Sequence, residues 1–140
     1  MAAFQNRLVV TEIDDRTFQV IDQPFGYQSD LLTDLILVPV GFYTDFESMI
    51  RWLPTLYALL GDVAHEPAVV HDWLYYSALT SREISDRIFL EAMGVKGLPF
   101  WRRYPIYWGV RLGGWKAWDD HRKAGHSVRD FDVISSRNAK

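Results

Sequence analysis

The chain has 140 residues, of which 49% are hydrophobic and 24% charged, and its formal net charge is −3. This length and composition predict one globular domain with a single core, and they exclude a disordered chain. Because the chain has no cysteine, a disulfide framework and a thiolate metal site are also excluded. The negative net charge gives no overall attraction to nucleic acid, so we expect no specific nucleic-acid binding.

The first third of the chain has the pattern of β-strands. Short runs rich in β-branched and aromatic residues are separated by turn-forming residues, first of all Asp14 and Asp15. The pattern predicts three to five short antiparallel strands, a small β-meander. The runs are residues 7–13, 17–22, 25–30 and 32–45.

Beyond Ser48 the pattern changes from strands to helices. Residues 49–60 predict a short helical segment that Pro54 interrupts. Pro67 fits the first turn of a helix that runs to about Leu79.

The next helix begins at a capping box, since Thr80 and Glu83 have the Ser/Thr-x-x-Glu spacing. Glu83 and Arg87 are four residues apart and predict an ion pair along the helix. Gly94 is expected to end it. With only a tight connection near residue 80, the two helices should form an antiparallel hairpin.

Residues 98–118 predict a third, aromatic-rich helix. We expect its apolar stripe to face the core, with the arginines reaching past it to solvent. The alternatives are that these aromatic and arginine side chains lie at a membrane interface or stack on nucleic-acid bases. Some of the aromatics are also expected to remain for a partner, because interfaces favour Trp, Tyr and Arg. Gly109 and Gly113 are expected to let another element approach closely. The stripe consists of Trp101, Tyr104, Trp108, Leu112 and Trp115.

The fold class is therefore α+β, an N-terminal antiparallel β-meander followed by a bundle of about three to four helices. We expect one domain over residues 1–118. Residues 119–140 are polar and weakly patterned, and predict a C-terminal tail or arm in which His121 and His126 are solvated. No apolar run approaches the roughly 18 residues of a membrane span, and residues 1–10 lack the apolar region of a signal peptide.

His71 and Asp72 interrupt an otherwise apolar and aromatic helix. His71 lies about 12 Å from the hairpin turn and Asp86 about 9 Å, at 1.5 Å per residue, so the two side chains should meet. A carboxylate fixes the tautomer of a histidine and stabilises its charged form, which suits a general base acting on water. The alternative is a buried hydrogen-bonded network that only locks the hairpin.

A second group of oxygen-bearing side chains lies at Thr44, Asp45, Glu47 and Ser48, where strand gives way to helix. Asp72 points about 100° away from His71 around the helix, so it cannot serve the same proton. Asp72 and Asp45 are candidate ligands of a divalent cation, Ca²⁺ or Mg²⁺. Capping by Ser48 and ordinary loop hydrogen bonds are the alternatives.

Residues 38 to about 114 resemble a small family of uncharacterised phage and prophage proteins. That family shows a Thr-Asp-x-x-Ser element, a His-Asp-x-Leu-Tyr helix and an Asp-Arg helix in this order. The resemblance implies a phage origin and gives Thr44, Ser48, Tyr75 and Arg87 a supporting role near substrate or in the structure. The matching positions are Asp45, Ser48, His71, Asp72, Tyr75, Asp86 and Arg87.

The two helices are also similar to the His-Asp helix pair of secreted phospholipases A2. This similarity implies that His71 activates a water molecule, that Asp72 binds calcium and that Asp86 orients the imidazole. The chain departs from those enzymes because it lacks cysteines and the glycine-rich calcium loop. What remains is a site that activates water or binds a cation.

Two functions follow from the sequence. One is a small phage-encoded hydrolase with His71 as general base, oriented by Asp86. The other is a non-enzymatic virion or tail protein, which contacts other phage proteins through the C-terminal tail and exposed aromatics. We expect synthesis in the cytoplasm of the bacterial host, and the second function adds incorporation into the particle.

Overall fold

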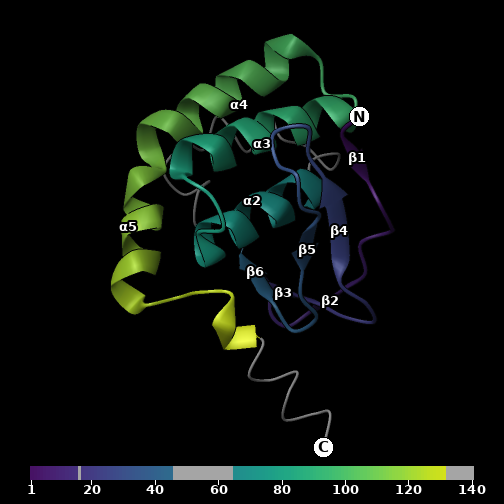
Figure 1. Cartoon of the computed structure of the whole chain (residues 1–140), viewed down its shortest axis with the longest axis vertical. Coiled ribbons are helices and arrows are strands. Elements are labelled where there is room, and N and C mark those ends of the chain that lie inside the picture. The colour runs from purple at the N-terminus through teal and green to yellow at the C-terminus, as the bar shows by residue number, and fades with distance from the viewer. Residues whose placement is uncertain (16, 46–64, 132–140) are drawn as a thin grey trace, which may run out of the picture.

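The computed structural model describes residues 1–15, 17–45 and 65–131, and within them short strands come first and helices follow (Figure 1). This confirms the predicted α+β class. The strands are β1 (Ala3–Phe4), β2 (Val10–Glu12), β3 (Thr17–Val20), β4 (Phe25–Gln28), β5 (Ile36–Val38) and β6 (Tyr43–Asp45). The helices are α2 (His65–Ser77), α3 (Arg82–Val95), α4 (Phe100–Gly113) and α5 (Trp115–Ala124).

The strands form two small antiparallel sheets rather than one meander. One sheet has the order β1-β4-β5 and the other the order β2-β3-β6. The turn between β2 and β3 is fixed by Asp14, whose side chain accepts a hydrogen bond of 2.9 Å from the backbone N–H of Thr17. The chain then leaves this pair to form the β4-β5 hairpin and returns to it as β6.

Helix α2 occupies the centre of the molecule. It contacts β5 and β6 on one side, α3 on another and α5 on a third, and α4 packs on the far side of α3 (Figure 1). Nine of its 13 residues are buried, which explains its nearly continuous apolar sequence. The main core consists of Val20, Phe25, Tyr27, Ile36, Val38, Phe42, Val69, Val70, Trp73, Leu74, Ile88 and Ala92.

Helices α2 and α3 form the predicted antiparallel hairpin, but the ends of α3 differ from the prediction. Its N-cap is Ser81, whose hydroxyl accepts a hydrogen bond of 3.2 Å from the N–H of Ile84. Thr80 lies one residue too early for this role. Gly94 lies inside the helix, and the chain turns only at Gly97, where φ is +90°.

The single helix expected over residues 98–118 is in fact two helices, α4 and α5, with Gly114 between them. Helix α5 runs through residue 118 to Ala124, and Val128 and Phe131 pack against the main core. The predicted domain boundary at residue 118 stays a prediction. The described residues beyond it, however, are joined to α2 and do not form a detached arm (Figure 1).

The expectation that the aromatic stripe of residues 98–118 faces the core is wrong. The side of α4 that packs inward is formed by Ile106 and Val110, together with Phe89, Met93 and Leu98 in a second small core. The stripe faces outward. Its exposed fractions are 61% for Trp101, 44% for Tyr104, 58% for Trp108, 78% for Leu112 and 56% for Trp115.

Two sequence-based expectations lie outside the described residues: the helical segment of residues 49–60, and the role of Ser48. Among the helices that the structure describes, none combines the length and the hydropathy needed to cross a membrane.

Candidate functional site

The structure brings His71 and Asp86 together across the α2–α3 hairpin. His71 Nε2 lies 2.7 Å from Asp86 Oδ1, and both side chains are fully buried. The imidazole stacks on Phe89, with ring centroids 4.6 Å apart. The rise per residue along two antiparallel helices was therefore sufficient to predict this contact.

Three further donors converge on the carboxylate of Asp86. Tyr75, one turn after His71 on α2, donates its hydroxyl to Oδ1 at 2.6 Å. Arg111 from α4 donates to Oδ2 at 2.7 Å, and Arg82 from α3 lies 3.4 Å from the same oxygen. The group of His71, Tyr75, Arg82, Asp86 and Arg111, here called the Asp86 network, thus joins three helices.

The Asp86 network keeps its carboxylate ionised. Burial by itself would raise the pKa of Asp86, but hydrogen bonds from His71, Tyr75 and Arg111 outweigh it and hold that pKa below its usual value. The same contact raises the pKa of Arg111, and burial beside an anion raises the pKa of Tyr75. Tyr75 and Arg111 therefore stay protonated while Asp86 stays charged.

An ionised carboxylate only accepts hydrogen bonds, so the proton between His71 and Asp86 belongs to His71 Nε2. In neutral His71 the lone pair is then on Nδ1. Nδ1 is buried and has no hydrogen-bond partner in the described part of the chain.

A second contact joins Asp72 to the sheet. Thr44 on β6 is fully buried and donates its hydroxyl to Asp72 Oδ2 at 2.6 Å. Asp72 lies on a different side of α2 from His71, as expected from their positions on the helix. The side chain of Asp45 and the whole of Ser48 lie outside the described residues, so the structure tests neither.

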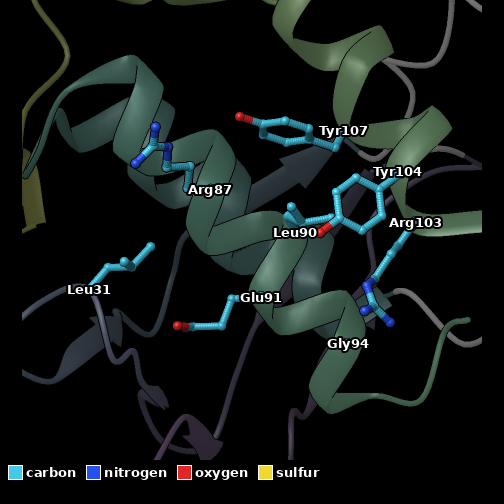
Figure 2. Close-up of a pocket in the computed structure, with 8 residues that line it drawn as sticks. All are labelled: Leu31, Arg87, Leu90, Glu91, Gly94, Arg103, Tyr104 and Tyr107. Carbon is cyan, nitrogen blue, oxygen red and sulfur yellow. The ribbon is translucent and has the colours of Figure 1, made fainter. Parts of the chain in front are cut away.

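Arg87 does not join the Asp86 network. Its guanidinium pairs with Glu83 at 3.1 Å, both side chains being about half exposed, which confirms the predicted pair one turn apart. Arg87 instead lines a shallow hollow of about 510 Å³ between α3 and α4. Figure 2 shows Arg87 and Arg103 at opposite ends of this hollow, with the rings of Tyr104 and Tyr107 along one side.

The polar groups of the hollow are largely engaged within the fold. Glu91 accepts hydrogen bonds from the Tyr27 hydroxyl at 2.7 Å and from the N–H of Asp30 at 3.2 Å. Arg103 donates to the carbonyl of Leu98 at 2.8 Å. The hollow includes neither His71 nor Asp86, so it is no substrate cleft for them.

The predicted cation site at Asp72 and Asp45 stays a prediction. Over residues 1–15, 17–45 and 65–131 the structure groups no three His, Cys, Asp or Glu side chains in a way that could hold a metal ion.

Sequence reasoning missed Arg82 and Arg111. Arg82 had a readable signal, because it lies four residues before Asp86 on the same helix face. Arg111 lies 25 residues from Asp86, and only the packing of α4 on α3 brings the two together.

The last turn of α5 and the residues after it form a second cluster on the C-terminal end of α2. Arg122 donates to the carbonyl oxygens of Tyr75 and Tyr76 at 2.8 and 2.6 Å. His126 stacks on Tyr76, and its Nδ1 lies 2.9 Å from Nδ1 of His121. The two histidines were expected to be solvated, but both are partly buried.

Fold and site together define an α+β protein whose helices are joined by a buried His-Asp-Tyr-Arg network. The chain belongs to a family of proteins of unknown function, DUF1353, whose profile matches residues 19–110. This confirms the expected membership of an uncharacterised family. No curated protein and no solved structure matches the chain.

Proposed function

We propose that the protein is a non-enzymatic phage or prophage protein, a virion or tail component, in which the Asp86 network braces the fold. The phage origin rests on the resemblance in the Thr-Asp-x-x-Ser, His-Asp-x-Leu-Tyr and Asp-Arg elements. The bracing role rests on the surroundings of one carboxylate.

The observation that carries the bracing role is that Asp86 is fully buried and accepts from His71 and Tyr75 on α2, Arg82 on α3 and Arg111 on α4. A catalytic carboxylate and its histidine need contact with a substrate or with water, whereas both side chains here have no exposed surface. A buried charge that keeps every oxygen hydrogen-bonded fixes the packing of the helices that supply the donors.

The first test compares Asp86→Asn with the exposed control Glu83→Gln. Breaking a buried charge pair by removing one partner costs about 3–5 kcal/mol, whereas an exposed pair contributes about 0–1 kcal/mol. We therefore expect a large loss of unfolding free energy in urea for Asp86→Asn and almost none for Glu83→Gln. Equal, small losses would contradict the bracing role.

The pH dependence of the free energy of unfolding provides a second test of the bracing role. Because the pKa of folded Asp86 is lowered, its contribution to stability is present above its unfolded pKa of about 3.9 and is lost as the pH falls through the folded value. In Asp86→Asn this part of the acid dependence should disappear, while Glu83→Gln should keep it.

The assembly role is tested on particles. The protein should be found by mass spectrometry in phage particles purified from a strain that expresses it, in a fixed ratio to the main tail and capsid proteins. Absence from purified particles would remove this part of the proposal and leave the bracing role untouched.

A second candidate function, a small hydrolase, is favoured by one observation: His71 Nδ1 is buried and has no partner in the described residues. With Nε2 held by Asp86, the lone pair of Nδ1 is the group that would accept a proton from water. Substrate would reach it only after a local opening of the helices.

A comparison of His71→Gln with wild type distinguishes a catalytic role of His71 from a purely structural one. If His71 is a general base, a screen of ester, phosphoester and amide model substrates should find an activity that His71→Gln abolishes without a matching loss of stability.

A thermal-shift series with Ca²⁺, Mg²⁺, Mn²⁺ and Zn²⁺ on wild type and Asp72→Asn tests whether Asp72 binds a divalent cation. Stabilisation of wild type that Asp72→Asn loses would favour the metal-assisted form, and no shift with any ion would count against it.

A further inference from the structure

We propose that residues 125–131, here called the strap, form a pH-sensitive conformational switch. The strap is held on α2 and α5 at neutral pH, and it opens when His121 and His126 both carry a positive charge. Its opening uncovers aromatic side chains of α2 while the rest of the domain stays folded.

The strap lies over the aromatic side of α2. The chain turns back after α5 (Figure 1) at Gly125, whose φ of +74° is a left-handed conformation that glycine adopts without strain. Val128 and Phe131 then pack against the main core. The ring centroid of Phe131 lies 5.5 Å from that of Trp73 and 5.6 Å from that of Tyr76. Release of the strap therefore exposes an aromatic surface that is covered in the closed form.

Two polar contacts hold the strap, and both can titrate. In the first, Nδ1 of His126 lies 2.9 Å from Nδ1 of His121 on α5, and the ring of His126 stacks on Tyr76 with centroids 4.3 Å apart. In the second, Tyr76 donates its hydroxyl to Asp130 at 2.8 Å, and the same carboxylate oxygen accepts from the N–H of Ser127 at 3.0 Å.

The contact between the two histidines tolerates one added proton but not two. When both rings are neutral, one Nδ1–H donates to the lone pair of the other Nδ1. When one ring is charged, its Nδ1–H still donates to the neutral ring, and the hydrogen bond is strengthened by the charge. A second proton removes the last lone pair and places two positive rings in contact. Opening is therefore expected only once both histidines are charged.

The surroundings of His121 make the second proton unfavourable in the closed form. Burial, then the charges of His126 and Arg122, lower the pKa of His121, and Asp120 opposes this shift. Because the open strap takes up the proton more readily, acid shifts the equilibrium toward the open form. In the described part of the chain, the charged and titratable groups around the two rings come from α2, α5 and the strap: Tyr76, Asp120, Arg122 and Asp130.

The other helix contacts do not depend on the strap. Arg122 attaches α5 to α2 through the carbonyl oxygens of Tyr75 and Tyr76, which do not titrate. The Asp86 network contains no strap residue, and its carboxylate has a pKa below the usual value. Acid that charges both histidines therefore leaves these contacts in place, so the change is local.

The experiment uses the absence of cysteine from the chain, because one introduced thiol then reports on one position. Val128→Cys reports on the strap, and Ala92→Cys, at a fully buried position in the main core, reports on unfolding of the whole domain. The reaction of each full chain with dithiodipyridine is followed from about pH 7 to about pH 4. Each rate is divided by that of the same chain unfolded in urea at the same pH, which corrects for the reactivity of the thiol itself.

We expect the corrected rate of Val128→Cys to rise at least about tenfold over this range, while that of Ala92→Cys stays low. Parallel rises in both variants would show global unfolding and overturn the proposal. A rate at Val128→Cys that does not change with pH would also overturn it.

Two further substitutions in the Val128→Cys chain identify the titrating group. His121→Gln should remove most of the rise, because glutamine can still form a hydrogen bond with His126 but takes up no proton. Asp130→Asn is the control and should keep the rise, because it leaves both histidines in place. Circular dichroism at neutral pH checks that both variants fold. A rise that His121→Gln keeps, or that Asp130→Asn loses, would contradict a switch operated by the two histidines.

Discussion

Gly114 lies close against Tyr75, a member of the Asp86 network. A Cβ built on this residue would lie 2.5 Å from the hydroxyl of Tyr75 and 2.6 Å from the carbonyl oxygen of Val110. Tyr75 is itself held by its hydrogen bond to Asp86. A side chain larger than hydrogen at this position would therefore have to displace the Tyr75 hydroxyl or the backbone of α4.

The neighbouring glycine provides a matched pair for a test. Gly114→Ala should destabilise the protein by about 1–3 kcal/mol, because the new methyl group overpacks a buried contact. Gly113→Ala should be neutral or stabilising by up to about 1 kcal/mol, because a Cβ there meets nothing within 4 Å and alanine favours the helix. Urea unfolding of both variants measures the difference, and equal effects would show that Gly114 is not a close-packed position.

At the scale of elements, the segment after α5 is held against α2 and α5, and its contact with α5 depends on protonation. Only one of the two Nδ1 atoms of His121 and His126 can donate in their 2.9 Å contact, so the contact requires that the two rings are not both charged. Burial, then the charges of His126 and Arg122, lower the pKa of His121 to about 4, and Asp120 opposes this shift. Nearby, Tyr76 donates to Asp130 at 2.8 Å.

A histidine whose pKa is lower in the folded than in the unfolded protein contributes stability at pH values above its unfolded pKa. This contribution is lost as the pH falls toward the folded pKa. We therefore expect the free energy of unfolding to decrease between about pH 6.5 and about pH 4, the unfolded and folded pKa values of His121. The amide protection factors of residues 126–131, which correct for the intrinsic exchange rate at each pH, should fall over the same range. His121→Gln should remove most of this pH dependence, and an unchanged profile in that variant would assign the effect to another group.

At the scale of the whole molecule, residues 119–131 contribute to the core although their sequence is polar. Arg122 satisfies two carbonyl groups at the C-terminal end of α2, where a cation also suits the helix dipole. Phe131 packs edge-on against Phe42 and Trp73. A chain ended at Trp118 would lose both contacts.

We expect that shortened chain to be less stable than the full chain by at least about 2 kcal/mol, by the usual cost of lost buried packing and hydrogen bonds. Arg122→Ala with Phe131→Ala should reproduce most of the loss, and the exposed control Lys123→Ala should not. Equal melting temperatures for the full and shortened chains would instead support a domain that ends at residue 118.

The sequence allowed the strand-rich first third, the α2–α3 hairpin and the meeting of His71 with Asp86 to be predicted, because each follows from local periodicity and rise per residue. It did not allow the side of α4 that faces the core to be predicted. Both sides of that helix carry large apolar residues, and only the packing of Ile106 and Val110 decides between them. Arg111 and Gly114 were missed for the same reason, since their roles arise from contacts distant in sequence.

Because α2 is covered by strands that precede it and by helices that follow it, its burial has a consequence for synthesis. When residue 77 leaves the ribosome, the strands are available to α2, but Arg122 and Phe131, which cover its other surfaces, are not yet made. Part of the surface of α2 in the nascent chain therefore stays exposed, and accessible to chaperones, until some fifty more residues have been synthesised and can pack against it.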